Sequence, residues 1–532
     1  MSHSIARQKG SVETIGEAAE HSEVERMQFR HPTSTVVTED PFTWPFWIKM
    51  GITLNVCANA FLNNISAAGL VPTLSPISAE LDIPITKAAG FMAYNVLAQG
   101  LGNMVWVPTM LTFGKRWTIL GTMVLLLPCI AWAASAKSYE SLLAARILSG
   151  FASGASESFA PVIIGEIWFE HNLTTALGFF ALCILAGAGL GQLCLGYVTQ
   201  GAGWRWAFWV TFIACGVNFL TMLIWLPETT FQRGLEVGTT AGDVERSEIV
   251  KEDKTRSGET ETGVNLVREQ QDGITLTLAS TAPELKSVSQ SIWFLRHPHV
   301  QYRQNWFLSF IRPFQFFVSV PVIWSSLTYG VAAGAFTALG VCIPQLTAGP
   351  PYNFGPGAQG LFGMSGLVGA ILGGTVGAKL VDLFNGHMEK RRFRQNQDHK
   401  PEERLVMMVM PFVTVSTGLI MYGFTIEKGM AWIAPAVGYA VHSFGFTVLA
   451  GITYSYTVDA YLIRSGEAMV FNNTIRALIS FGFADFMPNY MVKVGPETAY
   501  SVLAGTVWGI SILAIPIFFF GPRLRAMTNR LL

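Results

Sequence analysis

Apolar stretches long enough to cross a bilayer recur along almost the whole chain, beginning near Trp47. A helix needs roughly 20 largely apolar residues to cross about 30 Å of hydrocarbon. Backbone polar groups in lipid must be satisfied within each segment, and no alternating pattern suggests a barrel, so we expect helices. The predicted spans are roughly 47–70, 88–110, 117–136, 141–164, 174–198, 205–226, 318–345, 357–380, 405–426, 431–457, 467–492 and 498–520.

Composition agrees with a membrane protein, since 51% of the 532 residues are hydrophobic and only 13% are charged. The 35 basic and 35 acidic residues cancel, so nothing indicates a nucleic-acid partner. The six cysteines lie in or beside apolar stretches without metal-ligand spacing. We therefore expect reduced packing cysteines and no metal or other cofactor.

A long polar segment separates the spans into two groups of six. We expect a disordered cytosolic N-terminus over 1–45, an N-terminal six-helix half over 46–227, a cytosolic linker over 228–310, a C-terminal half over 311–522 and a cytosolic tail over 523–532. The two polar segments contain too few apolar residues to offset the entropy cost of ordering them.

Lysine and arginine residues set the expected orientation, because basic residues concentrate in cytosolic loops. Lys115 and Arg116, the basic run over 390–394 and the arginines of the tail all fall on one side. That side should be cytosolic, and the loops with single lysines, such as Lys137 and Lys428, should lie on the opposite side.

Charged residues inside spans are costly and therefore mark functional candidates. In the fourth span Arg146 and Glu157 are eleven residues apart, which is three helical turns, so we expect both to line an aqueous pathway. Glu157 is the first candidate for a proton-coupling group; a structural ion pair is the alternative.

The eleventh span contains Asn472, Arg476 and Asp485. Asn472 and Arg476 share a helix face, and Asp485 points elsewhere. We expect Asp485 to be the second candidate for protonation or for binding a substrate amine, with a structural pair as the alternative.

Amides and aromatic residues are candidates for lining a substrate cavity. They are Asn59 and Asn63 in the first span, Tyr94 and Gln99 in the second, and Trp324 and Tyr329 in the seventh, together with Asn472. The amides serve equally well to bond neighbouring helices, and aromatic residues in spans often serve only for packing. Those alternatives stay open at this point.

The residues that join and cross the spans resemble motifs of the major facilitator superfamily, and more closely those of fungal drug:proton antiporters and polyamine-permease-like proteins. Gly114, Lys115 and Arg116 match the end of the loop motif after the second span, although Val107 and Leu111 replace its first Gly and its Asp. In the fourth span Arg146 begins the pattern R-x3-G-x3-G. The resemblance implies twelve helices in two pseudo-symmetric six-helix halves, and a role for Arg146 in proton coupling.

The fifth span matches four glycines of the family's antiporter motif but not its proline. These glycines are Gly178, Gly187, Gly191 and Gly196, and we expect them to pack against neighbouring helices. By the pseudo-repeat, Glu166 corresponds to Asp459, and we expect both to form salt bridges at the cytosolic gate. Asp382 belongs to a degenerate copy of the loop motif in the second half.

The resulting hypothesis is secondary active transport of a small organic solute across a lipid bilayer. We expect proton-coupled export by antiport of amphipathic or polyamine-like cations, by a monomer in the plasma membrane or the vacuolar membrane. The alternatives are a proton-symport importer of an amine or other nutrient, and a non-transporting solute sensor. No P-loop, H-E-x-x-H or nucleophile–base pair is present, so we do not expect an enzyme.

Overall fold

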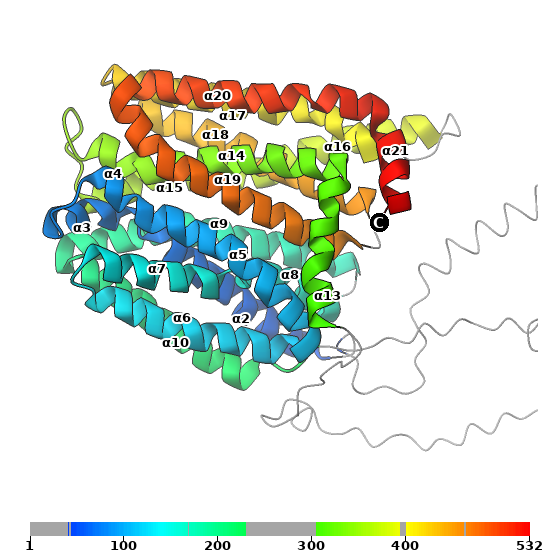
Figure 1. Cartoon of the computed structure of the whole chain (residues 1–532), viewed down its shortest axis with the longest axis horizontal. Helices are drawn as coiled ribbons and strands as arrows, with labels where there is room; N and C mark the ends of the chain where they lie inside the picture. The colour runs from blue at the N-terminus through cyan, green and yellow to red at the C-terminus, as the bar shows by residue number, and fades with distance from the viewer. Residues whose placement is uncertain are drawn as a thin grey trace, which may run out of the picture. The chain divides into compact units, whose positions relative to one another are not determined.

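The computed structural model describes residues 41, 44–168, 170–229, 305–393, 401–461 and 464–531. This part of the chain contains helices and no strand (Figure 1). The first half contains α2 (Phe46–Asn64), α3 (Leu74–Glu80), α4 (Ile85–Ala88), α5 (Gly90–Phe113), α6 (Lys115–Ser135), α7 (Tyr139–Ser153), α8 (Ser156–Ile167), α9 (Glu170–Ala202) and α10 (Trp204–Trp225). Between α2 and α3 the chain continues through a π-helical turn, η2 (Ile65–Gly69), and a 3-10 turn, η3 (Val71–Thr73).

The second half begins with the short helix α13 and a 3-10 segment, η4, which lead into the next long helix. Its elements are α13 (Trp306–Ile311), η4 (Arg312–Val318), α14 (Val320–Thr347), α15 (Pro356–Leu372), η5 (Gly373–Gly377), α16 (Ala378–Phe393), η6 (Pro401–Met408), α17 (Val409–Glu427), α18 (Ile433–Ala460), α19 (Ser465–Val494), α20 (Pro496–Ile512) and α21 (Ala514–Leu531). The segment η5 is also a π-helical turn. The described residues therefore have the all-α fold that the sequence predicts.

Ten helical segments in the described part are long and apolar enough to cross a membrane. Each coincides with one of the predicted spans. The other two predicted spans correspond to α5 and α19, which are long enough at 24 and 30 residues but are less apolar than the ten. Polar side chains lower their mean hydropathy: both contain asparagines, α5 contains Gln99, and α19 contains four charged residues.

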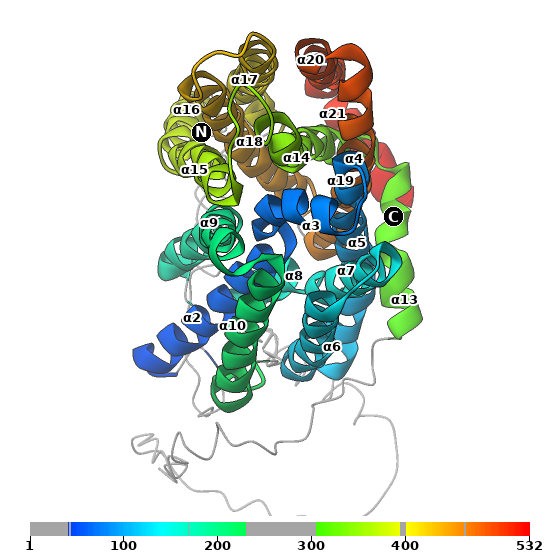
Figure 2. The same cartoon turned by 90° about the vertical axis from the view of Figure 1, so that its left-hand side faces the viewer.

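Helices of the same half pack mainly against one another. In the first half α5 and α6 contact α7, while α2 contacts α9 and α10; in the second half α14 contacts α19, and α17 contacts α18 and α20. Each half has its own apolar cores, such as the one that buries Val415, Leu419 and Tyr422 completely. Figure 2 shows most helices of the first half gathered on one side and most of those of the second half on the other, while α13 lies beside the first half, where it contacts α5.

The most extensive contacts between the halves are those of α9 with α15 and of α5 with α19. Small residues allow these close approaches, because lipid provides no hydrophobic drive and packing has to be tight. A Cβ atom on Gly360 would lie 2.2 Å from the backbone oxygen of Gln192, and one on Gly100 would lie 2.2 Å from the Cβ of Ala477. Both of these contacts between the halves, α9 with α15 and α5 with α19, therefore depend on glycine.

The expected domain boundaries stay predictions. Nearly all of 1–45 and most of 228–310 lie outside the described residues. Within the described part, α13 begins at Trp306, five residues before the predicted start of the second half.

Candidate transport cavity

A cavity of about 690 Å³ lies between the two halves. The second half supplies lining from α14, α15, η5, α18 and α19, and the first half from α2, η2, α5, α8 and α9. Most of its wall is apolar. The charged residues and most of the amides come from α5, α8 and α19, and we call this part of the wall the polar side of the cavity; single polar residues such as Asn64 and Gln192 lie elsewhere on the wall.

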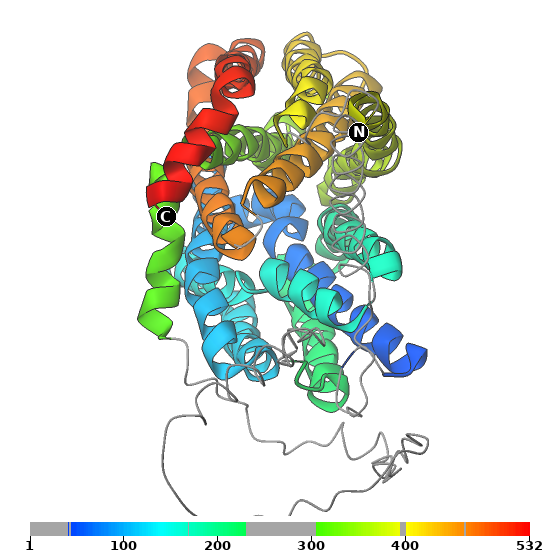
Figure 3. The same cartoon turned by 90° about the vertical axis from the view of Figure 1, so that its right-hand side faces the viewer.

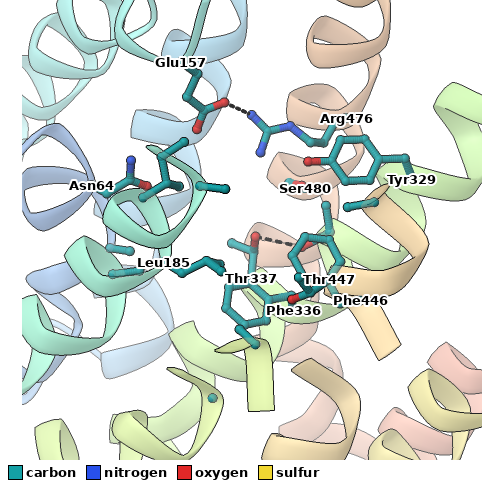
Figure 4. Close-up of a pocket in the computed structure, with 18 of the residues that line it drawn as sticks. Asn64, Glu157, Leu185, Tyr329, Phe336, Thr337, Phe446, Thr447, Arg476 and Ser480 are labelled. Atoms are coloured by element: carbon teal, nitrogen blue, oxygen red, sulfur yellow. Dashed lines mark hydrogen bonds and ion pairs between the residues drawn. The ribbon is translucent and has the colours of Figure 1, made fainter. Parts of the chain in front are cut away.

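Glu157 and Arg476 provide the charges that line this cavity among the described residues. Arg476 Nη2 donates to Glu157 Oε2 at 2.5 Å, which joins α8 of the first half to α19 of the second (Figure 4). Gln99 Nε2 lies 3.5 Å from the other carboxylate oxygen. Both side chains keep part of their surface exposed to the cavity, 21% for Arg476 and 17% for Glu157, so removing one partner leaves the other in contact with solvent and costs less than breaking a fully buried pair.

Aromatic rings of α14 and α18 form the wall next to Arg476. The Tyr329 ring lies 6.0 Å from that of Phe446 with nearly parallel planes, and Phe446 is stacked at 5.1 Å on Phe336. The Tyr454 hydroxyl donates to Asn473 Oδ1 at 2.7 Å. These rings give a solute a flat apolar surface beside the ion pair.

The halves meet closely at the end of the bundle predicted to be extracellular. There Gln200 Oε1 accepts from the backbone N–H of Gly357 at 3.2 Å, and Gly196 contacts the backbone of Pro356. Towards the opposite end, Phe180 in α9 and Met469 in α19 line the cavity. Figure 3 shows the bundle from this opposite end, which the basic residues predict to be cytosolic.

Arg146 does not line the cavity, and the expected shared face with Glu157 is wrong. Its side chain is 2% exposed, and its guanidinium donates to the backbone oxygens of Ser66 at 2.7 Å, Ala67 at 3.2 Å and Phe91 at 3.4 Å. The helix is interrupted between Ser153 and Ser156, where α7 ends and α8 begins. Regular helical spacing therefore does not extend from Arg146 to Glu157.

Four of the predicted cavity residues belong to helix packing instead. Asn63 Nδ2 donates to Asn59 Oδ1 at 2.8 Å, so these amides bond each other. The Trp324 indole N–H donates to the backbone oxygen of Ile510 at 3.2 Å, and the Tyr94 ring packs against that of Phe481 at 5.1 Å with the two planes tilted.

Asn472 is the fifth predicted cavity residue that the structure places elsewhere, since it is fully buried and does not line the cavity. Gln99 and Tyr329 do line it, as expected. In two cases the adjacent asparagine lines the cavity instead: Asn64 beside Asn63, and Asn473 beside Asn472.

Asp485 does not reach the cavity either. It lies in α19 nine residues beyond Arg476, is exposed, and is not a lining residue. Among the described residues, Glu157 is therefore the carboxylate that lines the cavity, and the role of Asp485 in protonation or amine binding stays a prediction for a residue outside it.

The predicted loop motif forms a network inside the first half. Gly114 ends α5 with a φ of 91°, a conformation that favours glycine. Glu228 then caps α6, because its two carboxylate oxygens accept from the backbone N–H groups of Lys115 and Arg116, each at 3.1 Å. Lys115 also forms an ion pair with Glu166.

These contacts fix the turn between α5 and α6 to the ends of α8 and α10. Thr229 Oγ1 adds a 2.8 Å hydrogen bond to Glu166, and Arg116 donates to the backbone oxygen of Leu223 at 3.0 Å. Among the described residues these partners belong to one half, so the network braces that half, and the gate role expected for Glu166 stays a prediction. Asp459 is partly buried in the last turn of α18, and the side chain of Asp382 lies outside the described residues, so their gate roles stay predictions.

Three of the four motif glycines in α9 pack closely, as expected. A Cβ on Gly187 would lie 2.4 Å from the backbone oxygen of Phe61, and one on Gly196 would lie 2.5 Å from that of Pro356. A Cβ on Gly191 would lie 3.2 Å from the Cα of Gly69. No described residue lies within 4 Å of the Cβ position of Gly178, so the packing role expected for Gly178 stays a prediction.

Three residues with a role here were not predicted from the sequence: Phe446 and Tyr454, which line the cavity, and Glu228, which caps α6. Phe446 and Tyr454 lie eight residues apart in the tenth predicted span, which places both on one helix face, and that spacing was a usable signal. Glu228 also had a signal, because an acidic residue that closes a helical hairpin is a natural partner for an exposed helix N-terminus.

Known proteins can now be compared with this architecture. The family model described as Major Facilitator Superfamily matches residues 56–484. The chain belongs to this superfamily. It is a transporter and not an enzyme, which confirms the coarse function expected from the sequence.

Among curated relatives, the chain is 26% identical over 509 residues to the efflux pump vrtL of Penicillium aethiopicum, covering 92% of this chain and 89% of the relative. It is 22% identical to Protein HOL1 of Saccharomyces cerevisiae over 540 residues, covering 94% and 90%. The crystal structure of the human organic anion transporter MFSD10 superposes with a TM-score of 0.55 at 14% identity, covering 88% of this chain and all of that one. The structural likeness shows the fold alone and confirms the major facilitator fold.

Proposed function

We propose that this superfamily member is a proton-coupled transporter of a small amphipathic organic solute, in which Glu157 takes up and releases the coupled proton. The observation that carries the proposal is the Glu157–Arg476 pair, which bridges the two halves inside the cavity at 2.5 Å. Protonating Glu157 removes its charge and weakens this bridge. A proton at one carboxylate therefore changes the contact between the halves, which alternating access requires.

The cavity supports an amphipathic solute better than a polyamine-like one. Several carboxylates are needed to compensate an extended polycation in a low-dielectric site. Among the described residues Glu157 is the carboxylate that lines the cavity, and it is already paired. The aromatic wall formed by Tyr329, Phe446 and Phe336 instead suits a solute with a flat apolar body.

The names of relatives support export as the physiological direction, since vrtL and radE are both described as efflux pumps. Antiport and symport remain the two coupling modes to be separated. They differ in the sign of the proton flux that accompanies an imposed solute gradient.

The test is reconstitution of the full chain in liposomes that contain a pH-sensitive dye, followed by addition of amphipathic aromatic solutes. We expect solute-dependent proton flux in the natural chain and its loss in Glu157→Gln. Glu140→Gln is the matched control, because Glu140 is an exposed glutamate in the first turn of α7, outside the cavity. Full coupled flux in Glu157→Gln would refute the assignment.

A further inference from the structure

Arg476 has more hydrogen-bonding capacity than its visible partner uses. A guanidinium group has five N–H donors in a planar fork. Within the described residues, one of its nitrogens, Nη2, donates to an acceptor, Glu157 Oε2 at 2.5 Å. The Nε–H is buried and has no acceptor among the described residues.

This arrangement leaves the fork available for a second group with two oxygen atoms. Bidentate pairing with a carboxylate is the geometry that a guanidinium favours. Glu157 makes a single-point contact and so does not occupy the fork. A buried donor without an acceptor is unfavourable, so a ligand that supplies an acceptor gains from binding here.

The surroundings of Arg476 indicate what kind of molecule would bring that carboxylate. Its guanidinium lies 5.6 Å from the centre of the Tyr329 ring, which begins the parallel series of Tyr329, Phe446 and Phe336. In Figure 4 Arg476 and Tyr329 lie side by side at the edge of the cavity, with Phe446 and Phe336 farther along the same wall. An acidic group at Arg476 therefore places an attached ring system against this aromatic wall.

The charges that line the cavity also favour an anionic solute over a cationic one. The lining carboxylate and the lining guanidinium cancel each other while they are paired. A cation that approached Glu157 would have to remain close to Arg476, which is repulsive. An anion that approached Arg476 faces repulsion from Glu157 only while that carboxylate is charged.

We propose that the cavity binds an organic acid with an aromatic body, whose carboxylate is taken by Arg476 when Glu157 is protonated. The proposal rests on the proposed role of Glu157 as the proton site. No covalent bond changes: one proton adds to the Glu157 carboxylate, its ion pair with Arg476 is lost, and the solute carboxylate forms a new pair with Arg476. One proton and one monoanion enter together, so the charge of the site does not change.

This order of events fixes the coupling mode. Because the proton and the acid occupy the site together, they move in the same direction, which is symport. Export is still possible in this mode, since an outward gradient of the acid drives the acid and the proton out together. Antiport, which the sequence predicts for a cation, would require the solute and the proton to exclude each other.

The experiment measures binding of three probes that share one ring system: 2-naphthoate, 2-naphthylmethanol and 2-naphthylmethylamine. Titration calorimetry on the full chain in lipid nanodiscs at pH 5.5 and pH 7.5 gives each Kd. We expect 2-naphthoate to bind at least about tenfold tighter than either other probe at pH 5.5, and more weakly at pH 7.5.

Variants then separate the two residues. In Arg476→Gln we expect the preference for 2-naphthoate to disappear while binding of 2-naphthylmethanol, which relies on the aromatic wall, is retained and so reports a folded cavity. Arg312→Gln is the matched control, because Arg312 pairs with Glu467 outside the cavity. In Glu157→Gln we expect tight binding of 2-naphthoate at both pH values.

The outcomes are distinct from those of the proton-flux experiment. Equal 2-naphthoate affinity in the natural chain and Arg476→Gln, or a preference for the amine, would overturn this inference but leave proton coupling at Glu157 standing. Persistent proton flux in Glu157→Gln would overturn the proposed function. No binding of 2-naphthoate to a chain that binds the alcohol would also overturn the inference.

Discussion

Arg146 and Arg476 both lie well inside membrane-spanning helices, away from the helix ends, and their surroundings differ. Arg146 is 2% exposed and uses its guanidinium on three backbone oxygens. Arg476 lines the cavity, with 21% of its side chain exposed, and donates to one carboxylate. An arginine in a span can therefore stabilise the packing of helices or serve the transport pathway, and its hydrogen-bond partners distinguish the two roles.

The two regions also differ in how closely their helices pack. Around Arg146, Asn95 Nδ2 donates to the Arg146 backbone oxygen at 2.7 Å, and a Cβ on Gly150 would lie 2.3 Å from the Asn95 oxygen. On the cavity wall, no described residue lies within 4 Å of the Cβ position of Gly451. The helices around Arg146 therefore pack closely, whereas the cavity wall at Gly451 adjoins open space.

The largest effect should come from Arg146→Gln. The change leaves backbone oxygens of Ser66, Ala67 and Phe91 without their donor, at about 1–3 kcal/mol for each group left unsatisfied. We expect a large loss of folded protein after detergent extraction, measured by size-exclusion chromatography, whereas Arg476→Gln keeps most of its yield. Equal yields of the two variants would remove the distinction between the arginines.

We expect an effect of intermediate size from glycine-to-alanine substitutions, which test how closely the helices pack in the two regions. Gly150→Ala would force α7 away from α5, and overpacking of this kind typically costs about 1–3 kcal/mol. We expect its thermal unfolding temperature in detergent to fall by several degrees. Gly451→Ala, with space for the added methyl group, should unfold at the natural temperature; a similar fall there would contradict the description of the two regions.

The smallest effect should come from Asp485→Asn. Its side chain is exposed and outside the cavity, so proton flux and solute binding should stay within about twofold of the natural chain. Liposome flux measurements under the conditions used for Glu157→Gln provide the comparison. Loss of flux in Asp485→Asn would restore the second proton site that the sequence suggested.

The fold was largely predictable from the sequence because apolar length alone identifies most spans. The sequence also predicts α5 and α19 as spans, although they are less apolar than the other ten. Their polarity has a physical explanation, since both helices contribute to the polar side of the cavity through Gln99, Asn103, Asn473 and Arg476.

The lining residues of the cavity were predicted less well than the spans. The direction of a side chain depends on the local backbone geometry, and regular helical spacing does not account for breaks and π-helical turns. Glu157 and Tyr329 were identified correctly as lining residues. Arg146 was misplaced by the break before α8, and Asn63 was chosen where Asn64 lines the cavity, one residue before η2 begins. Partners distant in sequence, such as Glu157 and Arg476, cannot be inferred from spacing within one helix.

The π-helical turns η2 and η5 both contribute to the cavity wall, through Ala67 and Ala68 in one and Gly373 and Gly374 in the other. A π turn holds one residue more than the α-helical turn it replaces. Each is therefore a place where the chain can lose a residue without shortening the span, by reverting to an α-helical turn. Related transporters of slightly different length can thus share the same spans, and a residue-by-residue comparison with them should be allowed to shift by one at these two turns.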